Sequence, residues 1–522
     1  MLGLHEEFQS LAAILSATAQ KLPHKIAVIF RDEITSYSQL EIMSNQVANA
    51  LKNMGIVLGT KVALYCINSP WFVAAYYGIL KIGATVVPIN LLLNINEIEY
   101  ILSNSESKAL IYFDVFEQNV ISVKDQLPHL KNLIVVGQAT ELEAQPITDI
   151  IANEDSAFST AEVNQKKHVA SIIYTSGTTG KPKGAMLTHR NLLHNVNSIL
   201  QSIDLQDSDI FFTVLPMFHS FGSTVGMNTP IAGGATIVAV PRFMPEEVGK
   251  MIYKTQSTIF MGVPSMYTIF ANIPENRKPD FSSLRICFSG GAALPVEVMK
   301  RFEMKYNVPI CEGDGPTECS PVTSINPIYG KRKPGSIGKV IPDVQMKIVD
   351  QDGNEMSTGK IGEIVVRGEN VMKGYFKMPE ETAESFFGEW YRTGDMGYVD
   401  DEDYFYIVDR KKDMIIVNGM NVYPRMIEEV IYQHVAVLEV AVVPEPDDLH
   451  GEIPRAVIAL KPRGSASKDN ILDLCRRNLG RHQIPRVIEF VDQLPKSPTG
   501  KILKRELIRK GEIERGIDIR TN

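Results

Sequence analysis

The segment YTSGTTGKPKGAMLTHRNL, residues 174–192, has no bulky apolar side chain between Tyr174 and Met186. Its glycines allow another molecule to approach the backbone closely. Hydroxyls, flexible backbone N–H groups and two cations together favour a bound phosphate. The segment is not a Walker A motif, because only two residues separate its first two glycines and its first lysine precedes a proline. The predicted phosphate loop consists of Ser176, Gly177, Thr178, Thr179, Gly180, Lys181 and Lys183.

The loop lies within an alternation of apolar runs and helix-like periods. The run ASIIY (170–174) leads straight into it, and Thr188 can cap a following helix whose apolar residues share one face. The same plan recurs at KVALYC (61–66), followed by a helix over 71–83, and at LRICFSGGAALP (284–295). This alternation is typical of α/β proteins, whose open sheets bind ligands where strands end in loops.

The pattern changes after about residue 330. KIGEIVVRG, DYFYIVD and DMIIVNG are short strand-like runs that predict a β-rich subdomain. The charged run DRKKD (409–413) interrupts them, and we expect a hinge there. A unit of about 110 residues follows, with helices predicted over 425–434 and 470–480 and strands over 437–445, 455–462 and 487–492.

Composition excludes several classes of protein. The 522 residues carry a net charge of −8, which gives no basic surface for nucleic acid. Five cysteines without metal spacing predict reduced thiols and a cytoplasmic protein. The N-terminus is typical of an amphipathic helix and not of a signal peptide, and no apolar run is long enough to span a membrane. We therefore expect at most peripheral membrane contact.

Five motifs in order along nearly the whole chain carry a family resemblance. The sequence resembles the adenylate-forming superfamily of acyl-CoA synthetases, non-ribosomal adenylation domains and luciferases, and is most similar to bacterial fatty-acid–CoA ligases. The motifs are YTSGTTGKPKG, EGDGPTECSPV (312–322), WYRTGD (390–395), VDRKKDMIIVNGMNVYP (408–424) and LPKSPTGKILKREL (494–507).

The resemblance implies an α/β fold with a large N-terminal domain and a small mobile α+β C-terminal domain. The N-terminal adenylation core, residues 1–409, would contain two α/β sheets plus the β-rich subdomain. Residues 410–413 would form the hinge and residues 414–522 the mobile domain.

The resemblance also implies a two-step reaction. A carboxylate attacks the α-phosphorus of ATP to give an acyl-adenylate and pyrophosphate, and a thiol then displaces AMP. Because the first step joins two anions, the site must neutralise charge and align the reactants. The expected cofactors and partners are ATP, Mg²⁺, a fatty acid, and either CoA or the phosphopantetheine of a carrier protein.

Each nucleotide-binding residue is implied by its motif. Glu318 would bind Mg²⁺, and Thr317 would contact the α-phosphate. Asp395 would accept hydrogen bonds from both ribose hydroxyls, a task that suits a carboxylate, and Arg410 would reach the same sugar. The remaining predicted nucleotide contacts are the phosphate loop with Thr175, the backbone wall of Gly290, Gly291 and Ala292 beside adenine, and Asp314 and Gly315. Asp314 departs from the family pattern, because many relatives have an aromatic residue there.

The C-terminal motifs imply a moving part. Lys501 would bridge the attacking carboxylate and the α-phosphate, which requires the C-terminal domain to swing about Lys412. Gly419 would then line the pantetheine channel, although closing a β-turn is an alternative role for this glycine.

The acyl site is implied by PMFHSFG (216–222), with His219 beside the reacting carboxylate. No acidic residue lies between Phe211 and Arg242 to hold a substrate ammonium, which disfavours amino acids. An apolar tunnel suits a medium to long fatty acyl chain. We expect this tunnel to be lined by Phe221, Gly222, Met227, Met261, Gly262 and Val263.

Alternatives remain open at this point. The acyl group could be loaded onto a carrier protein, although no insertion before the hinge points to one. Luciferase-like oxidation is a further alternative because the scaffold is shared, but no residue argues for it. A non-catalytic acyl or nucleotide sensor belongs to a different class, and the retained motifs argue against it. Aromatic or branched acids are further substrates to consider. We expect a monomer or homodimer.

Overall fold

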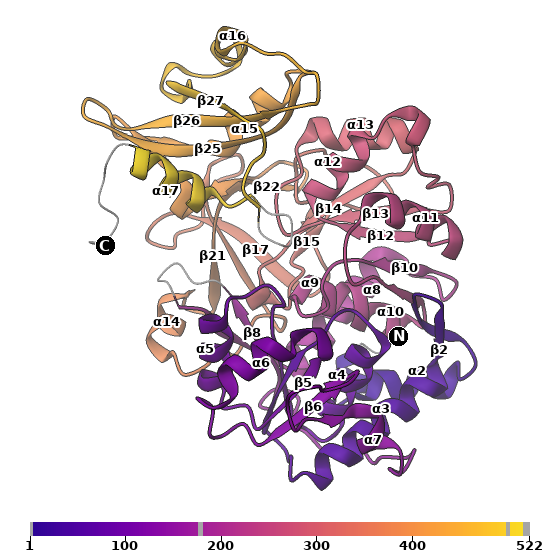
Figure 1. The fold of residues 1–522 in the computed structure, drawn as a ribbon. Coiled ribbons are helices and arrows are strands. Elements are labelled where there is room, and N and C mark those ends of the chain that lie inside the picture. Colours follow the sequence, from indigo (N-terminus) through magenta and orange to yellow (C-terminus); the bar gives the residue numbers. More distant parts are fainter. Residues whose placement is uncertain (1–3, 176–180, 497–501, 515–522) are drawn as a thin grey trace.

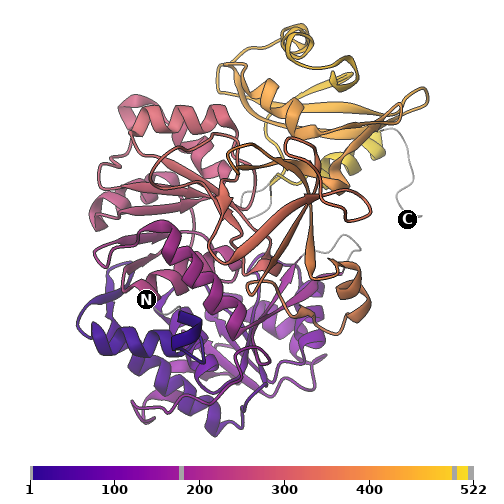
Figure 2. The ribbon, with the colours of Figure 1, turned by 180° about the vertical axis from the view of Figure 1, so that it is seen from behind.

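The computed structural model describes residues 4–175, 181–496 and 502–514. Three lobes form the large N-terminal part, and the small C-terminal unit lies above them in Figure 1, with the reverse view in Figure 2. The α/β fold with a large N-terminal domain and a small C-terminal domain is confirmed.

The first sheet is mainly parallel, but β8 pairs with β9 and β9 with β19 in antiparallel fashion. Its described strands, in spatial order, are β19 (Gly374–Tyr375), β9 (Lys183–Thr188), β8 (Val169–Thr175), β4 (Thr85–Pro88), β3 (Lys61–Tyr65), β5 (Ala109–Phe113), β6 (Asn132–Val136) and β7 (Gln145–Pro146).

The second sheet is parallel in its centre and antiparallel at both edges. Its order is β16 (Lys339–Val340), β15 (Ser324–Ile325), β14 (Ile310–Asp314), β13 (Ile286–Ser289), β12 (Ile259–Gly262), β10 (Ile210–Thr213), β11 (Thr236–Ala239), β1 (Ile26–Phe30) and β2 (Glu33–Ser36).

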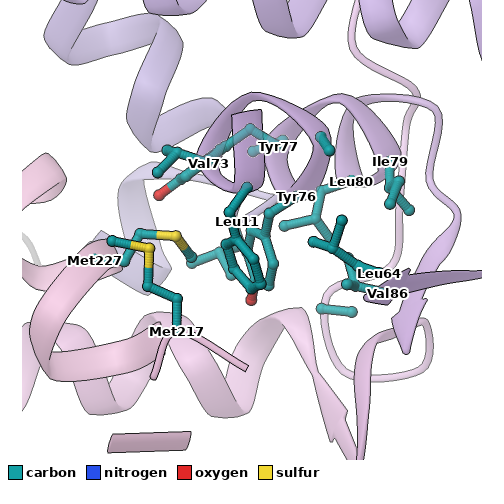
Figure 3. Close-up of a cluster of buried hydrophobic side chains, with 14 of the residues drawn as sticks. Leu11, Leu64, Val73, Tyr76, Tyr77, Ile79, Leu80, Val86, Met217 and Met227 are labelled. Carbon is teal, nitrogen blue, oxygen red and sulfur yellow. The ribbon is translucent and has the colours of Figure 1, made fainter. Parts of the chain in front are cut away.

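Helices α3 (Tyr37–Asn53), α4 (Pro70–Lys81) and α8 (His189–Ile203) share one hydrophobic core with strands of both sheets. Every residue of α4 except Trp71 is buried, as expected of a helix that is apolar all round. Figure 3 shows the side chains of this helix packed against the strand residues Leu64 and Val86 on one side and against two methionines on the other.

The outer faces of both sheets are covered by further helices. Helices α5 (Ile95–Ser105) and α6 (Glu117–Lys124) pack on the first sheet, and α11 (Pro245–Thr255), α12 (Pro264–Asn272) and α13 (Val296–Tyr306) pack on the second. The shorter or peripheral helices are α1 (Leu4–Glu7), α2 (Ala13–Lys21), α7 (Ile147–Ile151), α9 (Ser220–Ser223), α10 (Thr229–Gly233) and α14 (Pro379–Glu384).

The predicted β-rich subdomain is the third lobe. Its strands are β17 (Val344–Val349), β18 (Gly362–Gly368), β21 (Trp390–Val399), β20 (Phe386–Phe387) and β22 (Phe405–Arg410), all paired in antiparallel fashion. The strand DMIIVNG does not belong to it. Residues Ile415–Val417 (β23) pair with β24 and β26, so this run opens the C-terminal sheet instead.

The C-terminal unit is a sheet with helices on both faces. Helices α15 (Pro424–Tyr432) and α16 (Lys468–Asn478) pack on one face, and α17 (Lys504–Glu514) packs on the other. Its strands are β24 (Met420–Val422), β23, β26 (Gly451–Leu460), β25 (Val437–Asp447) and β27 (Val487–Val491).

Two local details differ from the sequence predictions. The sequence analysis predicts no strand between the phosphate loop and the helix capped by Thr188, but Lys183–Thr188 forms strand β9, because it pairs with β8 across the loop. The expected single N-terminal helix is two short helices, α1 and α2.

All five cysteines are buried and free. In the described part of the chain, no helix combines the length and apolar character needed to cross a bilayer.

Thr188 caps α8 as the sequence predicts. Its hydroxyl accepts the Asn191 N–H at 3.2 Å, and Asn191 Oδ1 accepts the Thr188 N–H at 2.8 Å, which completes a capping box. The cap fixes the start of a helix that lies between the two sheets.

We expect Thr188→Ala to lower the free energy of unfolding by about 1 kcal/mol, because it removes the cap from α8. Urea denaturation followed by circular dichroism measures this loss. Thr188→Ser is the matched control, since it also removes the methyl group but keeps the hydroxyl. Equal losses in the two variants would contradict a role for the cap.

Candidate active site at the junction of the sheets

Four segments that are distant in sequence meet around the carboxylate of Glu318. Glu318 lies in a short 3-10 turn after β14 and is only 8% exposed. Its Oε1 atom accepts a hydrogen bond from the Tyr375 hydroxyl at 2.9 Å and another, at 3.4 Å, from the Thr175 hydroxyl. Beside it, Thr317 Oγ1 lies 3.0 Å from Ser220 Oγ. The predicted metal ligand is thus held between the end of β8, the start of α9 and β19.

Tyr375 is a site residue that the sequence analysis missed. It reaches Glu318 because β19 pairs with β9, with Gly374 opposite Met186. Burial, followed by the Glu318 carboxylate, raises the pKa of Tyr375, so its phenol remains protonated and donates. A lone tyrosine carries no sequence signal for this role. Ser220 was also missed, although it lies inside the PMFHSFG segment.

Asp395 and Arg410 face each other across two strands of the third lobe. They are directly opposite in the β21–β22 pairing, and Arg410 Nε lies 2.7 Å from Asp395 Oδ1. The Asp395 side chain is 5% exposed and that of Arg410 is 45% exposed. Asp395 is the main cause of the raised pKa of Arg410, and Asp314 and Glu318 raise it further. The carboxylates predicted to surround the nucleotide therefore all lie within electrostatic reach of one guanidinium.

The predicted backbone wall depends on glycines. Gly291 has φ of +79°, a conformation that other residues rarely adopt. A Cβ on Gly315 would lie 1.6 Å from the Pro321 carbonyl oxygen, so a side chain does not fit there. Both glycines line a pocket together with Gly290 and Asp314. Ala292, the third predicted wall residue, is half-buried beside them.

The pocket runs inward from this mouth between α8 and the strands β13 to β15. His219 and Ser220 lie at the entrance with the glycines. His219 is exposed, and its Nδ1 accepts the Phe221 N–H at 3.3 Å at the start of α9. The apolar lining includes Ile199, Ile203, Val225, Phe288, Val322 and Ile325.

Some of the predicted tunnel residues lie at the pocket and others do not. Phe221 lines the pocket, and Val263 lies beside it, with a methyl group 3.9 Å from the position of a Cβ on Gly291. Gly222 packs on backbone, since a Cβ there would lie 2.0 Å from the Pro216 carbonyl oxygen. Gly222 is not among the lining residues.

The two methionines and Gly262 lie in the cores instead of the lining. Met227 is fully buried and points toward Tyr76 and Met217 in Figure 3. Met261 is fully buried in the core of the second sheet, and Gly262 packs against the Tyr267 ring. Residues of α8, Ile199, Ser202 and Ile203, line the pocket instead.

The remaining predicted residues are only partly placed. Ser176, Gly177, Thr178, Thr179, Gly180 and Lys501 lie outside the described residues. Lys183 Nζ lies 5.2 Å from the centre of the Tyr375 ring, and Lys181 Nζ lies 5.8 Å from that of Tyr100. Lys412 is exposed in the 3-10 turn after β22. Gly419, with φ of +76°, closes the exposed turn between β23 and β24, and its Cβ position is open on all sides.

Comparison with known proteins identifies the family. The model of the AMP-binding enzyme family matches residues 15–376, and that of the AMP-binding enzyme C-terminal domain matches residues 426–501. The chain belongs to the AMP-binding enzyme family. It is an enzyme, an AMP-forming acid–thiol ligase.

Similar proteins agree over nearly the full length of this AMP-binding enzyme. It is 36% identical to a long-chain-fatty-acid–CoA ligase of Bacillus subtilis (strain 168), over 96% of this chain and 94% of that protein. It is 31% identical to the anthranilate CoA ligase AuaEII in complex with anthranoyl-AMP, with a TM-score of 0.92 over 97% of this chain and 98% of that one.

Two structures of one protein differ in their similarity to this AMP-binding enzyme. Both are of MatB from Rhodopseudomonas palustris, 29% identical over 96% of this chain and 99% of that one. The ATP-bound structure gives a TM-score of 0.88 and the apo structure 0.79. The arrangement described here is therefore closer to that of ATP-bound MatB.

We expect Tyr375→Phe to raise the KM for ATP about tenfold, because Glu318 loses a hydroxyl that holds its carboxylate in place. Pyrophosphate release at varied ATP and fixed Mg²⁺ measures the change. Tyr406→Phe is the matched control, since it removes a tyrosine hydroxyl that lies 3.3 Å from the Asp400 carboxylate, away from the pocket. An unchanged KM in Tyr375→Phe would show that this hydrogen bond does not position Glu318.

Proposed function

We propose that the enzyme activates a medium to long fatty acid with ATP and transfers the acyl group to CoA. The observation that carries the proposal is the apolar pocket that opens beside Ser220, whose hydroxyl contacts Thr317 next to Glu318. Such a pocket suits an alkyl chain and directs its carboxylate to the polar mouth. The similarity to the Bacillus subtilis long-chain-fatty-acid–CoA ligase supports the same substrate class.

In the first half-reaction the acyl carboxylate oxygen bonds to the α-phosphorus of ATP, and the bond to pyrophosphate breaks. Both reactants are anionic, so cations and hydroxyls must lower their repulsion. Lys181 and Lys183 act on the β- and γ-phosphates with the phosphate loop, and Thr317 acts on the α-phosphate. Asp395 accepts hydrogen bonds from the ribose hydroxyls, and Arg410 holds the Asp395 carboxylate in orientation.

Glu318 is suited to act as a Mg²⁺ ligand. Mg²⁺ is commonly bound by one or two carboxylates with substrate phosphates and water, and Glu318 is a buried carboxylate whose Oε1 is already held by hydroxyls. When bound, the ion would neutralise phosphate charge and align the triphosphate. The described residues contain no group of three or more metal-ligating side chains, so most ligands would have to come from ATP and water.

In the second half-reaction the CoA sulfur attacks the acyl carbon and AMP leaves. We propose that the C-terminal unit pivots at Lys412 between the two half-reactions, with residues 410–413 as the hinge. Lys501 serves the first half-reaction, and Gly419 serves the second by allowing the thin pantetheine arm to pass close to backbone.

Product analysis tests the proposal. The purified enzyme is incubated with ATP, Mg²⁺, CoA and a mixture of fatty acids from short to long, with anthranilate and benzoate in a parallel reaction, and products are identified by mass spectrometry. Fatty acyl-CoA is the expected product. Acyl-AMP without acyl-CoA would indicate a carrier protein as acceptor, and aromatic acyl-CoA alone would overturn the substrate class.

We expect Lys501→Ala to lower acyl-adenylate formation by at least about 100-fold, since a positioned cation is worth several kcal/mol to the transition state. CoA-dependent consumption of supplied acyl-adenylate should remain within about twofold. Lys510→Ala, on the following helix, is the control and should affect neither half-reaction. Equal losses in both half-reactions of Lys501→Ala would contradict the assignment of Lys501 to one step.

A further inference from the structure

Helix α13 of the large domain begins without a capping side chain of its own. Its N-cap residue is Pro295, which has no side-chain acceptor, and the first helical residue is Val296. The missing acceptor comes from the small domain: Glu429 of α15 accepts the Val296 N–H through Oε2 at 3.3 Å. A carboxylate at a helix N-terminus is favoured both by the free N–H groups and by the helix dipole. The two domains are therefore joined at this helix end.

The turn that leads into α13, residues 294–296, is also held by a carboxylate of the large domain. Glu312 of β14 is 1% exposed, and its Oε1 accepts the Leu294 N–H at 2.9 Å. Residues 294–296 thus lie between two carboxylates, one from the core and one from the mobile domain. This turn continues directly from Gly290 and Gly291, which line the mouth of the pocket. A contact that fixes α13 therefore also fixes the end of the predicted adenine wall.

Arg425 orients α15 for this contact. Its backbone N–H donates to Asp409 Oδ2 at 2.8 Å, and its Nη1 donates to the Ile407 carbonyl at 2.6 Å, so α15 is anchored on β22 just before the hinge. The Arg425 side chain is 12% exposed, and its Nε lies 3.9 Å from Glu429 Oε1. Burial raises the pKa of Glu429, so the contact with Val296 must offset a desolvation cost.

We propose that Glu429 is a positioning residue that locks the C-terminal domain in the arrangement for acyl-adenylate formation and braces the adenine wall through the N-terminus of α13. The proposal rests on the proposed two-step function. Its support is the contact across the domains together with the closer similarity to the ATP-bound than to the apo MatB structure. When the C-terminal domain pivots for the thiol step, Glu429 must leave Val296.

Two variants and one control test the proposal in the full-length enzyme. Glu429→Ala removes the acceptor, whereas Glu429→Gln keeps a carbonyl oxygen in its place. Glu247→Ala is the matched control, because it removes a carboxylate from the first turn of α11, a helix of the large domain that likewise has no side-chain cap. We expect Glu429→Ala to lower kcat/KM for ATP–pyrophosphate exchange about tenfold and Glu429→Gln to recover most of it. Thiolysis of supplied acyl-adenylate by CoA should be unchanged or faster.

A second readout does not depend on activity. Lys411 and Lys412 are exposed in the hinge, so limited trypsin digestion should cut there faster in Glu429→Ala than in the wild type or Glu247→Ala. Unchanged cleavage, or equal losses in exchange and thiolysis, would overturn the lock. Faster cleavage in an enzyme whose wild type shows no exchange with fatty acids would support the lock and refute the proposed substrate instead.

Discussion

The buried carboxylate of Glu318 is the constraint on which the site depends. A carboxylate at 8% exposure is costly unless hydrogen bonds or cations compensate it. Two hydroxyls from the first sheet donate hydrogen bonds to this carboxylate. They belong to Thr175 at the end of β8 and to Tyr375 on β19. These hydrogen bonds therefore join the turn after β14 of the second sheet to the first sheet. The pocket lies beside this junction, since its lining residue Ser220 contacts Thr317.

The site separates charge from apolar surface over a short distance. Asp314 lines the pocket, and the ion pair of Asp395 and Arg410 lies within electrostatic reach of it, so charged and hydrogen-bonding groups gather on this side. Behind the glycine turns, the lining is aliphatic and aromatic. The proposed fatty acid would match both halves, because its chain could leave water while its carboxylate stayed at the polar end.

The C-terminal domain adds a second constraint. It contributes the acceptor for α13 through Glu429 and is anchored on β22 through Arg425, close to the proposed hinge. In the proposed pivot these contacts would be exchanged for others, since each half-reaction requires different groups beside the adenylate.

The sequence by itself determined the family, the α/β class and the cap of α8, because these depend on local patterns: a glycine–hydroxyl–lysine loop, alternating apolar runs, and Thr188 three residues before Asn191. Motif positions also predicted Glu318, Asp395 and Arg410, which the structure brings to one place. Tertiary structure alone decided the partner of Glu318, the pocket lining and the cap of α13. Tyr375 reaches Glu318 through the pairing of β19 with β9, Met227 turns into the core instead of the pocket, and Glu429 crosses between domains. Each depends on which distant surfaces pack together, and no local pattern encodes that.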